Sequence, residues 1–345
     1  MDKRWEVKKT DLEIVKKLAK DLNVSEIVAH LLVLRDIKTF DQAKMFFRPK
    51  LTHLHDPFLM KNMQIAVKRI ETAILKNQKI LVYGDYDVDG TTSVALIYSF
   101  FKKYNNNIEY YIPCRYEEGY GISLKGIEYA HNNNFSLIIA LDCGIRAIEQ
   151  IDYANKKSID FIICDHHNPG KNIPNAIAVL NPKQIDCKYP YKELSGCGVG
   201  FKLVQAYCMQ NDISFNQIIK YLDLLTVSIG ADIVPMSGEN RVLAFYGLKQ
   251  INSSPSIGIK SLIDLSSKTK ELSMSDVVFG IAPRINAAGR IDHARKAVEI
   301  LVEDNYEKAK LLANKIEENN KIRKDLDRNI TSEALDMVDE NKKST

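Results

Sequence analysis

The feature that most constrains the fold is a regular alternation of apolar and amphipathic segments between residues 79 and 167. Apolar runs of strand length precede stretches with helical spacing, in the order KILVYGD, TTSVALIYSFFKKY, IEYYIPC, LKGIEYAHNN, FSLIIALDCG, RAIEQIDYANKKS and DFIICDHH. Such alternation is typical of a parallel sheet with helices on both faces. The sequence therefore predicts an α/β fold, a parallel β-sheet flanked by helices, and from Gly196 to about Ser267 a helical second half.

Acidic residues and histidines gather where these predicted strands end. The first strand is followed by Asp85, Asp87 and Asp89, the third by Asp142, and the fourth by Asp165, His166 and His167. Asp232 follows another apolar segment, in VSIGADIVPM. Because ligands bind beyond the carboxyl ends of the strands in sheets of this kind, we expect these side chains to share one site.

The stretch LVYGDYDVDGTTS allows two other interpretations. Its D-x-D-x-D-G pattern opens like a calcium-binding EF-hand loop, but the twelfth position, where a bidentate Glu closes such a loop, is Leu96, and the preceding segment is strand-like. Alternatively, the aspartates cap a helix that begins near Thr91 or Thr92. One aspartate could serve as a cap, whereas three in one loop repel each other unless a cation or a raised pKa relieves them.

The acidic loops together contain enough ligands for two divalent cations. The expected metal ligands are Asp87, Asp89, Asp142, His166 and Asp232, with Asp85 as a further candidate. Carboxylates and imidazoles without thiolates favour Mn²⁺ or Mg²⁺ over a structural zinc. Asp142, alone on its loop, is the expected bridge between two ions, although a single Asp after a strand is more often a helix cap.

Two further residues of the DHH segment have expected roles in catalysis. Asp165 is either a ligand or the partner that fixes the tautomer of a histidine. His167 is expected to donate a hydrogen bond or a proton to the phosphate or the leaving group. Together with Asp142, these two residues form the predicted catalytic set.

Composition narrows the class of protein. Met1 to Glu13 is charged and lacks the apolar core of a signal peptide, and no run approaches the ~20 apolar residues of a membrane span, so we expect a cytoplasmic protein. The six cysteines form no C-x-x-C pair, which predicts reduced thiols. Residues 1–80 contain 17 Lys and Arg against 10 Asp and Glu, an excess that suits a polyanion but is more often a solvated face.

The chain divides into three predicted parts. Residues 1–75 are a helical, basic N-terminal segment packed on the core, and residues 76–300 are the catalytic domain. From 301 to 345, apolar residues at helical spacing without Pro or Gly predict one long connecting helix.

Four of these segments carry a family resemblance. In order along the chain, GDYDVDG, ALDCG, CDHH and GADIVPM look like the four motifs of the DHH phosphoesterases. HDPFLMKNM, YYIPCRYEEGYGIS, SGCGVGFKLVQA and APRINAAGRI resemble segments of the RecJ-type exonucleases within that family, so the likeness spans nearly the whole chain. The resemblance implies a hydrolase with a pair of Mn²⁺ or Mg²⁺ ions that degrades single-stranded DNA in the 5′ to 3′ direction, in DNA repair and recombination. A helicase or a single-strand-binding protein is the kind of protein partner it implies.

The same resemblance suggests residues that contact substrate. APRINAAGR supplies Arg284, Asn286 and Arg290, whose guanidinium groups are expected to reach phosphate. Arg115 and Tyr120, in CRYEEGYGIS, are expected to contact the backbone and to stack on a base. Ordinary surface arginines and rim tyrosines are the alternative interpretation.

Two departures from the pattern affect the prediction. Pyrophosphatase-like relatives have a histidine where this chain has Tyr83, which favours a nuclease. RecJ-type proteins continue past the long helix into a DHH-associated domain, and we expect the present chain to be an amino-terminal catalytic part with a weakened grip on substrate. The rival functions are a short-oligonucleotide or cyclic-dinucleotide phosphodiesterase and a non-catalytic DNA-binding or replication scaffold.

Overall fold

The computed structural model describes residues 4, 6–266, 270–291 and 293–343. Its elements, in chain order, are α1 (Leu12–Leu22), α2 (Glu26–Val33), α3 (Phe40–Phe47), η1 (Leu51–His53), η2 (Pro57–Leu59), α4 (Met63–Leu75), β1 (Lys79–Gly84), α5 (Val88–Phe101), β2 (Ile108–Tyr111), α6 (Leu124–Asn132), β3 (Phe135–Leu141), α7 (Ile148–Lys156), β4 (Asp160–Cys164), β5 (Ala178–Leu180), α8 (Gly196–Gln210), η3 (Phe215–Gln217), η4 (Ile219–Tyr221), α9 (Leu222–Ala231), α10 (Gly238–Ser253), α11 (Ile257–Asp264), α12 (Met274–Asp276), the π-helical η5 (Val277–Ile281), α13 (Ala282–Ile291), α14 (Arg295–Val302) and α15 (Tyr306–Lys343).

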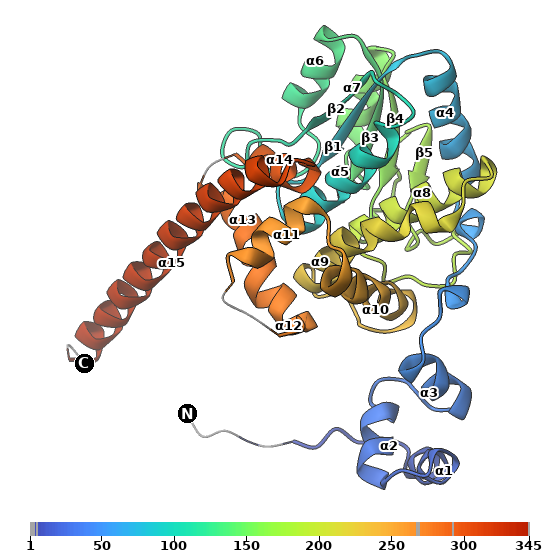
Figure 1. The fold of residues 1–345 in the computed structure, drawn as a ribbon, viewed down its shortest axis with the longest axis vertical. Helices are drawn as coiled ribbons and strands as arrows, with labels where there is room; N and C mark the ends of the chain where they lie inside the picture. Colours follow the sequence, from blue (N-terminus) through green and yellow to red (C-terminus); the bar gives the residue numbers. More distant parts are fainter. Residues whose placement is uncertain (1–3, 5, 267–269, 292, 344–345) are drawn as a thin grey trace.

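A parallel sheet lies in the upper part of the view in Figure 1, among the helices α4, α5, α6 and α7. In the described part of the chain its strand order is β2-β1-β3-β4-β5, and each neighbouring pair is parallel. Alternate residues of the strands point to opposite faces, as the two-residue period of a strand requires. The predicted parallel sheet is therefore confirmed.

The two faces of the sheet carry different helices. On one face, Ile80 and Val82 of β1 and Leu137 of β3 belong to the main core, which also contains buried residues of α4, α5 and α8. On the other face, Leu81 and Ile138 pack with buried residues of α6 and α7. Burial on both faces explains why these strands read as continuous apolar runs.

The N-terminal helices have a small core of their own. Buried residues of α1, α2 and α3, such as Leu18, Ala29 and Ala43, form a cluster separate from the main core, whereas α4 packs into the main core. The Arg241 guanidinium of α10 lies 3.6 Å from the centroid of the Phe46 ring and joins this unit to the rest of the molecule. Figure 1 shows α1, α2 and α3 away from the sheet, at the end of an extended connection.

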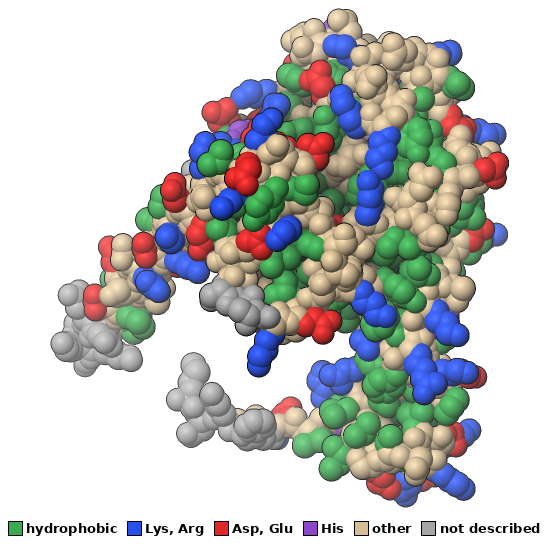
Figure 2. Space-filling model, viewed as in Figure 1, with side chains coloured by type: hydrophobic (Ala, Val, Ile, Leu, Met, Phe, Trp, Pro, Cys, Tyr) green, Lys and Arg blue, Asp and Glu red, His purple; other side chains and the backbone are tan. Residues whose placement is uncertain are grey.

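Charge and exposure distinguish the two ends of the chain. Figure 2 shows Lys and Arg side chains over the N-terminal helices and the connection to α4. At the other end, α15 packs against α11 and α13 and then projects from the body, where Ile322, Leu326 and Ile330 are exposed. Among the described helices, none combines the length and the apolar character that crossing a membrane requires.

Candidate metal centre

The predicted site residues lie where the sheet and the helical half meet. Asp85, Asp87 and Asp89 follow β1, Asp142 follows β3, and Asp165, His166 and His167 follow β4, while Asp232 is the residue after α9. Because β1, β3 and β4 are adjacent and parallel, their carboxyl ends bring these loops together at one edge of the sheet.

Helix α5 begins at Val88, three residues before the earlier of its two predicted starts, Thr91. Asp87 is its N-cap, and the Asp87 Oδ1 accepts a hydrogen bond of 2.9 Å from the Gly90 N–H. The carboxylate therefore satisfies a free backbone donor and stabilises the helix start. As a result Asp89 lies inside the first helical turn, so the segment expected to be loop is already helix there.

The Asp89 carboxylate is held by the beginning of α8. Its Oδ2 accepts a hydrogen bond of 2.6 Å from the Gly196 N–H, and its Oδ1 accepts one of 2.8 Å from the Cys197 N–H. The Ser228 hydroxyl of α9 donates to the same Oδ1 over 2.7 Å. A helix N-terminus favours negative charge, so α8 stabilises the ionised carboxylate in a fixed orientation.

Asp142 occupies the centre of the cluster in an unusual backbone conformation. Its φ is +59°, in the left-handed region, and the residue is 2% exposed. A Cβ on Gly196 would lie 2.6 Å from the Asp142 Cβ, so α8 can approach this closely only with glycine there. Strained, buried positions of this kind are concentrated at functional sites.

His166 contacts three of the carboxylates with one ring nitrogen. Its Nε2 lies 3.2 Å from Asp142 Oδ1, 3.5 Å from Asp232 Oδ2 and 3.7 Å from Asp89 Oδ2. Burial lowers the pKa of His166, which favours the neutral imidazole that binds metal ions. Among the described residues, neither of its ring nitrogens has a hydrogen-bond partner, and nor does Asp142 Oδ1.

His167 is oriented by two neighbours. Its Nδ1 lies 2.7 Å from Asp165 Oδ1, and its Nε2 lies 3.3 Å from the Tyr120 hydroxyl. The hydrogen bond that the His167 Nδ1 donates to Asp165 raises the pKa of His167. Burial acts to raise the pKa of Asp165, but the bonds from His167 and the Ile145 N–H outweigh it, and the pKa is lowered. Asp165 is therefore an ionised acceptor that holds the His167 ring in place.

The remaining carboxyl groups favour protonation in the absence of a cation. Burial, then the nearby Asp87, raises the pKa of Asp85 to about 7, and burial, then Asp89, raises that of Asp232 to about 7. Burial and the surrounding aspartates raise the pKa of Asp142 well above its ordinary range. A divalent cation removes both the cost of burying these charges and the repulsion between them, because it neutralises the carboxylates.

The donor atoms fit a hard or borderline divalent ion. Within the described residues, the potential ligand atoms of Asp142, His166 and His167 lie within 4.8 Å of one another, and those of Asp89, His166 and Asp232 form a second such group. Burial raises the pKa of the Cys143 and Cys197 thiols well above the ordinary value, so both stay neutral and leave oxygen and nitrogen as donors. This set suits Mn²⁺ or Mg²⁺.

Asp85 and Asp87 stand at the margin of these two groups. The Asp87 side chain contacts that of Asp142, and Asp85 has a buried Oδ1 without a hydrogen-bond partner among the described residues. The Arg115 guanidinium, whose charge partly opposes the rise that burial causes in the pKa of Asp85, lies 4.0 Å from the centroid of the Tyr86 ring. Arg115 therefore lies at the first acidic loop, and Tyr120 lies at His167.

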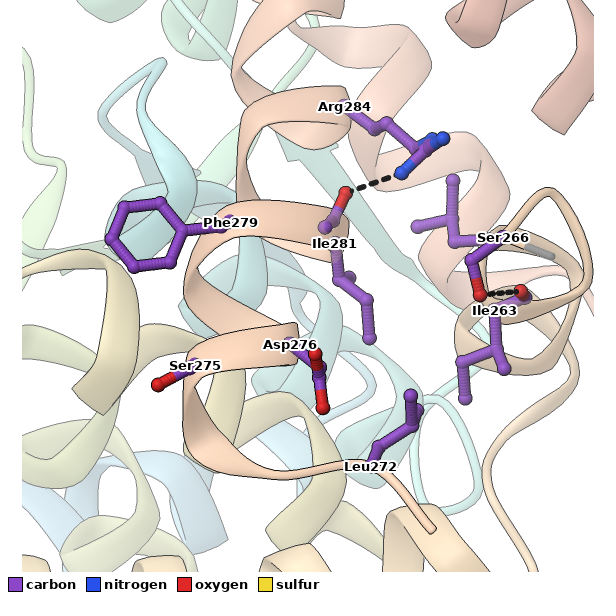
Figure 3. A pocket seen from close by; sticks show the side chains of 10 residues that line it. Ile263, Ser266, Leu272, Ser275, Asp276, Phe279, Ile281 and Arg284 are labelled. Atoms are coloured by element: carbon purple, nitrogen blue, oxygen red, sulfur yellow. Dashed lines mark hydrogen bonds between the residues drawn. The ribbon is translucent and has the colours of Figure 1, made fainter. Parts of the chain in front are cut away.

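The predicted phosphate-binding residues of α13 do not form one cluster. Arg284 pairs with Glu317 of α15, with Nε 2.7 Å from Oε2, and its Nη1 donates to the Gly280 carbonyl. It lies at the wall of a cavity of about 160 Å³ between α11 and η5 (Figure 3). Arg290 is exposed, and its carbonyl accepts a hydrogen bond of 2.8 Å from the Tyr116 hydroxyl. Asn286 is half-buried on the same helix.

Several residues of the site carry no local sequence signal. Ser228 and Gly196 hold Asp89, and the fully buried Asn181 donates through its Nδ2 to the His167 carbonyl over 2.9 Å. Lys183 affects the pKa of both His166 and Asp232 through its charge. Gly196 lies in the glycine-rich segment SGCGVG, but nothing in the local sequence indicates which residue this segment contacts.

Comparison with known proteins finds relatives that match most of the chain. The model of the DHH family, N-terminal domain, matches residues 79–229. The single-stranded-DNA-specific exonuclease RecJ of Bacillus subtilis is 39% identical over 338 residues, which cover 98% of this chain and 42% of that protein. The RecJ of Escherichia coli is 33% identical over 297 residues, covering 83% and 52%. The chain thus spans about half the length of these relatives.

Solved structures of RecJ are also similar to this chain. The crystal structure of RecJ from Thermus thermophilus in complex with Mn²⁺ superposes with a TM-score of 0.80 at 27% identity, covering 94% of this chain and 46% of that one. A crystal structure of exonuclease RecJ bound to manganese gives 0.76 at 30% identity, covering 84% and 72%. On these matches in sequence and in fold, the chain belongs to the DHH family and is a homologue of RecJ.

Proposed function

We propose that this chain is the catalytic part of a metal-dependent exonuclease that hydrolyses single-stranded DNA from its 5′ end. The observation that carries the proposal is the cluster around His166 Nε2, in which three carboxylates lie within 3.7 Å of a buried imidazole. Buried ligand atoms without partners among the described residues are costly unless they bind an ion. The likeness to RecJ relatives and to their manganese-bound structures supports the choice of substrate and metal.

The proposal assigns a role to each residue of the cluster. Asp89, Asp142, His166 and Asp232, with Asp87 beside Asp142, would hold two Mn²⁺ or Mg²⁺ ions. When bound, such ions supply Lewis-acid charge that polarises a phosphodiester and lowers the pKa of an attacking water. The helix α8 and Ser228 keep the Asp89 carboxylate in position throughout.

His167 is the proposed proton donor. The hydrogen bond to Asp165 raises the pKa of His167, which favours the protonated ring, and the side chain is exposed on the side where a leaving oxygen would lie. Asp165, bonded to Nδ1, leaves Nε2 as the nitrogen that faces the substrate side. Arg115, Tyr120 and Arg290 are proposed to contact the strand, and Arg284 to act mainly through Glu317.

The proposal extends to organisation and location. Residues 76–300 would form the catalytic domain, since every proposed ligand lies within them. A cytoplasmic location is supported by the six cysteines, all of which lie in the described part of the chain as free thiols.

Hydrolysis of a 5′-labelled oligonucleotide tests the proposal. Incubation with Mn²⁺ is expected to release labelled mononucleotide from the single strand and to leave a duplex control intact. Asp142→Ala removes a central carboxylate and is expected to lower the rate by at least about 100-fold. Asp186→Ala is the matched control, because Asp186 is a surface aspartate paired with Lys61, and its rate should stay within twofold of wild type, as for a surface change.

Other outcomes would favour the rival functions. Cleavage of dinucleotides with little action on long strands would indicate a short-oligonucleotide or cyclic-dinucleotide phosphodiesterase. DNA binding without hydrolysis, unchanged in Asp142→Ala and independent of Mn²⁺, would indicate a scaffold.

A further inference from the structure

Ile233 has a strained backbone conformation that no burial of its side chain offsets. It is the second residue after α9, directly following Asp232, and its φ is +57°. Its side chain is 84% exposed. An apolar, β-branched residue therefore occupies a left-handed backbone position at the protein surface.

Glycine is the residue that such a position ordinarily favours. Helices commonly end in a left-handed residue just past the cap, where the absence of a Cβ avoids a clash with the backbone. A β-branched residue is a genuine outlier there. Because the Ile233 side chain is exposed, burial does not compensate for the strain.

The surrounding structure keeps the strained segment in place. The Pro235 carbonyl accepts hydrogen bonds from the Tyr191 hydroxyl, over 3.2 Å, and from Asn240 Nδ2, over 3.1 Å. Beside Asn240, the buried Glu239 pairs with Lys202, with 2.6 Å between Nζ and Oε1. Strain that is maintained in this way is typical of functional positions.

We propose that Ile233 is a specificity-determining residue that contacts the sugar and base of the nucleotide undergoing hydrolysis. The inference rests on the proposed function and adds a contact to it. Asp232, the adjacent residue, has its Oδ2 3.5 Å from His166 Nε2, so Ile233 follows the metal centre directly in the chain. An unpaired nucleotide exposes an apolar base face that a duplex conceals in its stack, so an exposed aliphatic side chain here favours a single strand.

Three substitutions separate this contact from a structural role. Ile233→Asn introduces a residue that tolerates the left-handed region and removes the apolar side chain, and Ile233→Gly relieves the strain more fully. Ile233→Leu keeps the apolar side chain. The measurements are KM and kcat on a single-stranded oligonucleotide, the Kd of the same labelled oligonucleotide in EDTA by fluorescence anisotropy, Mn²⁺ affinity by calorimetry, and Tm.

The Asn and Gly variants are expected to raise KM and the EDTA Kd about tenfold, the effect of losing a small apolar contact in a binding site. In these two variants, Mn²⁺ affinity and kcat should stay within about twofold of the wild-type values. The Tm of the Gly variant should be no lower than that of the wild type, and the Leu variant should retain the wild-type KM. Unchanged KM and Kd in the Asn and Gly variants would overturn the inference, as would a rise in KM that follows a loss of Mn²⁺ affinity. If the wild-type chain binds the oligonucleotide without hydrolysing it, the proposed function is overturned. The Kd values of the wild type and the variants in EDTA would still show whether Ile233 contacts the oligonucleotide.

Discussion

Replacing Gly196 by alanine should displace Asp142 although none of the proposed metal ligands is itself substituted. A Cβ at position 196 would lie 2.6 Å from the Asp142 Cβ, 2.7 Å from its Oδ1 and 2.9 Å from its Cα. Ordinary contacts between carbon atoms are about 3.5–4.0 Å, so the overlap is close to 1 Å. Two of the three atoms belong to or adjoin the Asp142 backbone, so rotation of a side chain cannot relieve the contact.

The size of the effect follows from that overlap. Overpacking of this kind lowers the free energy of unfolding by about 1–3 kcal/mol. A displacement of ~1 Å at a reacting group lowers a rate by about 100-fold. The Gly196 N–H also donates to Asp89 Oδ2, so a shift of α8 would disturb a second carboxylate. We expect Mn²⁺ affinity to fall by about 10–100-fold, the range for groups that support metal ligands.

The assay compares Gly196→Ala with Gly198→Ala in the same helix. At position 198 the nearest atoms to a Cβ are the Leu194 Cβ, at 3.3 Å, and the Leu194 Cδ2, at 3.4 Å, so this neighbour has to give way by only a few tenths of an ångström. Gly198→Ala should retain Mn²⁺ affinity and hydrolysis and gain up to about 1 kcal/mol from helix propensity. Calorimetry with Mn²⁺, oligonucleotide hydrolysis and urea unfolding are measured on both. Wild-type Mn²⁺ affinity and a rate within threefold of wild type in Gly196→Ala would refute the reasoning.

Two further predictions concern charge. Asp85 and Asp232 have pKa values raised to about 7, so their protonated forms stabilise the fold below about pH 4 and this stability is lost as the pH rises through 7. Metal ions compete with these protons, so Mn²⁺ should raise Tm, relative to EDTA, more at pH 8 than at pH 5.5. An equal rise in Tm at both pH values would contradict this prediction. Arg284→Ala should lower the free energy of unfolding, measured in urea, by about 1–3 kcal/mol, because the partly buried Glu317 loses this partner. The KM for the oligonucleotide should change little. Unchanged stability together with a raised KM would instead indicate that Arg284 contacts the substrate.

Much of the fold followed from local patterns. The strands β1 to β4 were predicted because buried parallel strands are continuous apolar runs between helical segments. The site was expected at their carboxyl ends, and the structure brings Asp89, Asp142, His166 and Asp232 together there. The strand β5 was missed, since three residues, Ala178–Leu180, are too short to show a period.

The support of the site could not be read from the sequence because it depends on distant pairs. Gly196 and Cys197 contact Asp89 across 107 and 108 residues, and Ser228 does so across 139. No local period relates such residues. The earlier start of α5 has a similar origin, because Asp87 could act as a cap or as a free ligand, and only the packed structure shows the bond to the Gly90 N–H.

Because α1, α2 and α3 have a core of their own, we expect them to unfold together and separately from the part of the molecule that contains the sheet. Only eight buried residues form that cluster in the described part of the chain, against the extensive core around the sheet. Small clusters of this kind open with a lower free energy than the whole molecule, so their amide hydrogens exchange sooner. Opening of these three helices is therefore expected to leave β1, α5 and α8, which position the carboxylates, in place.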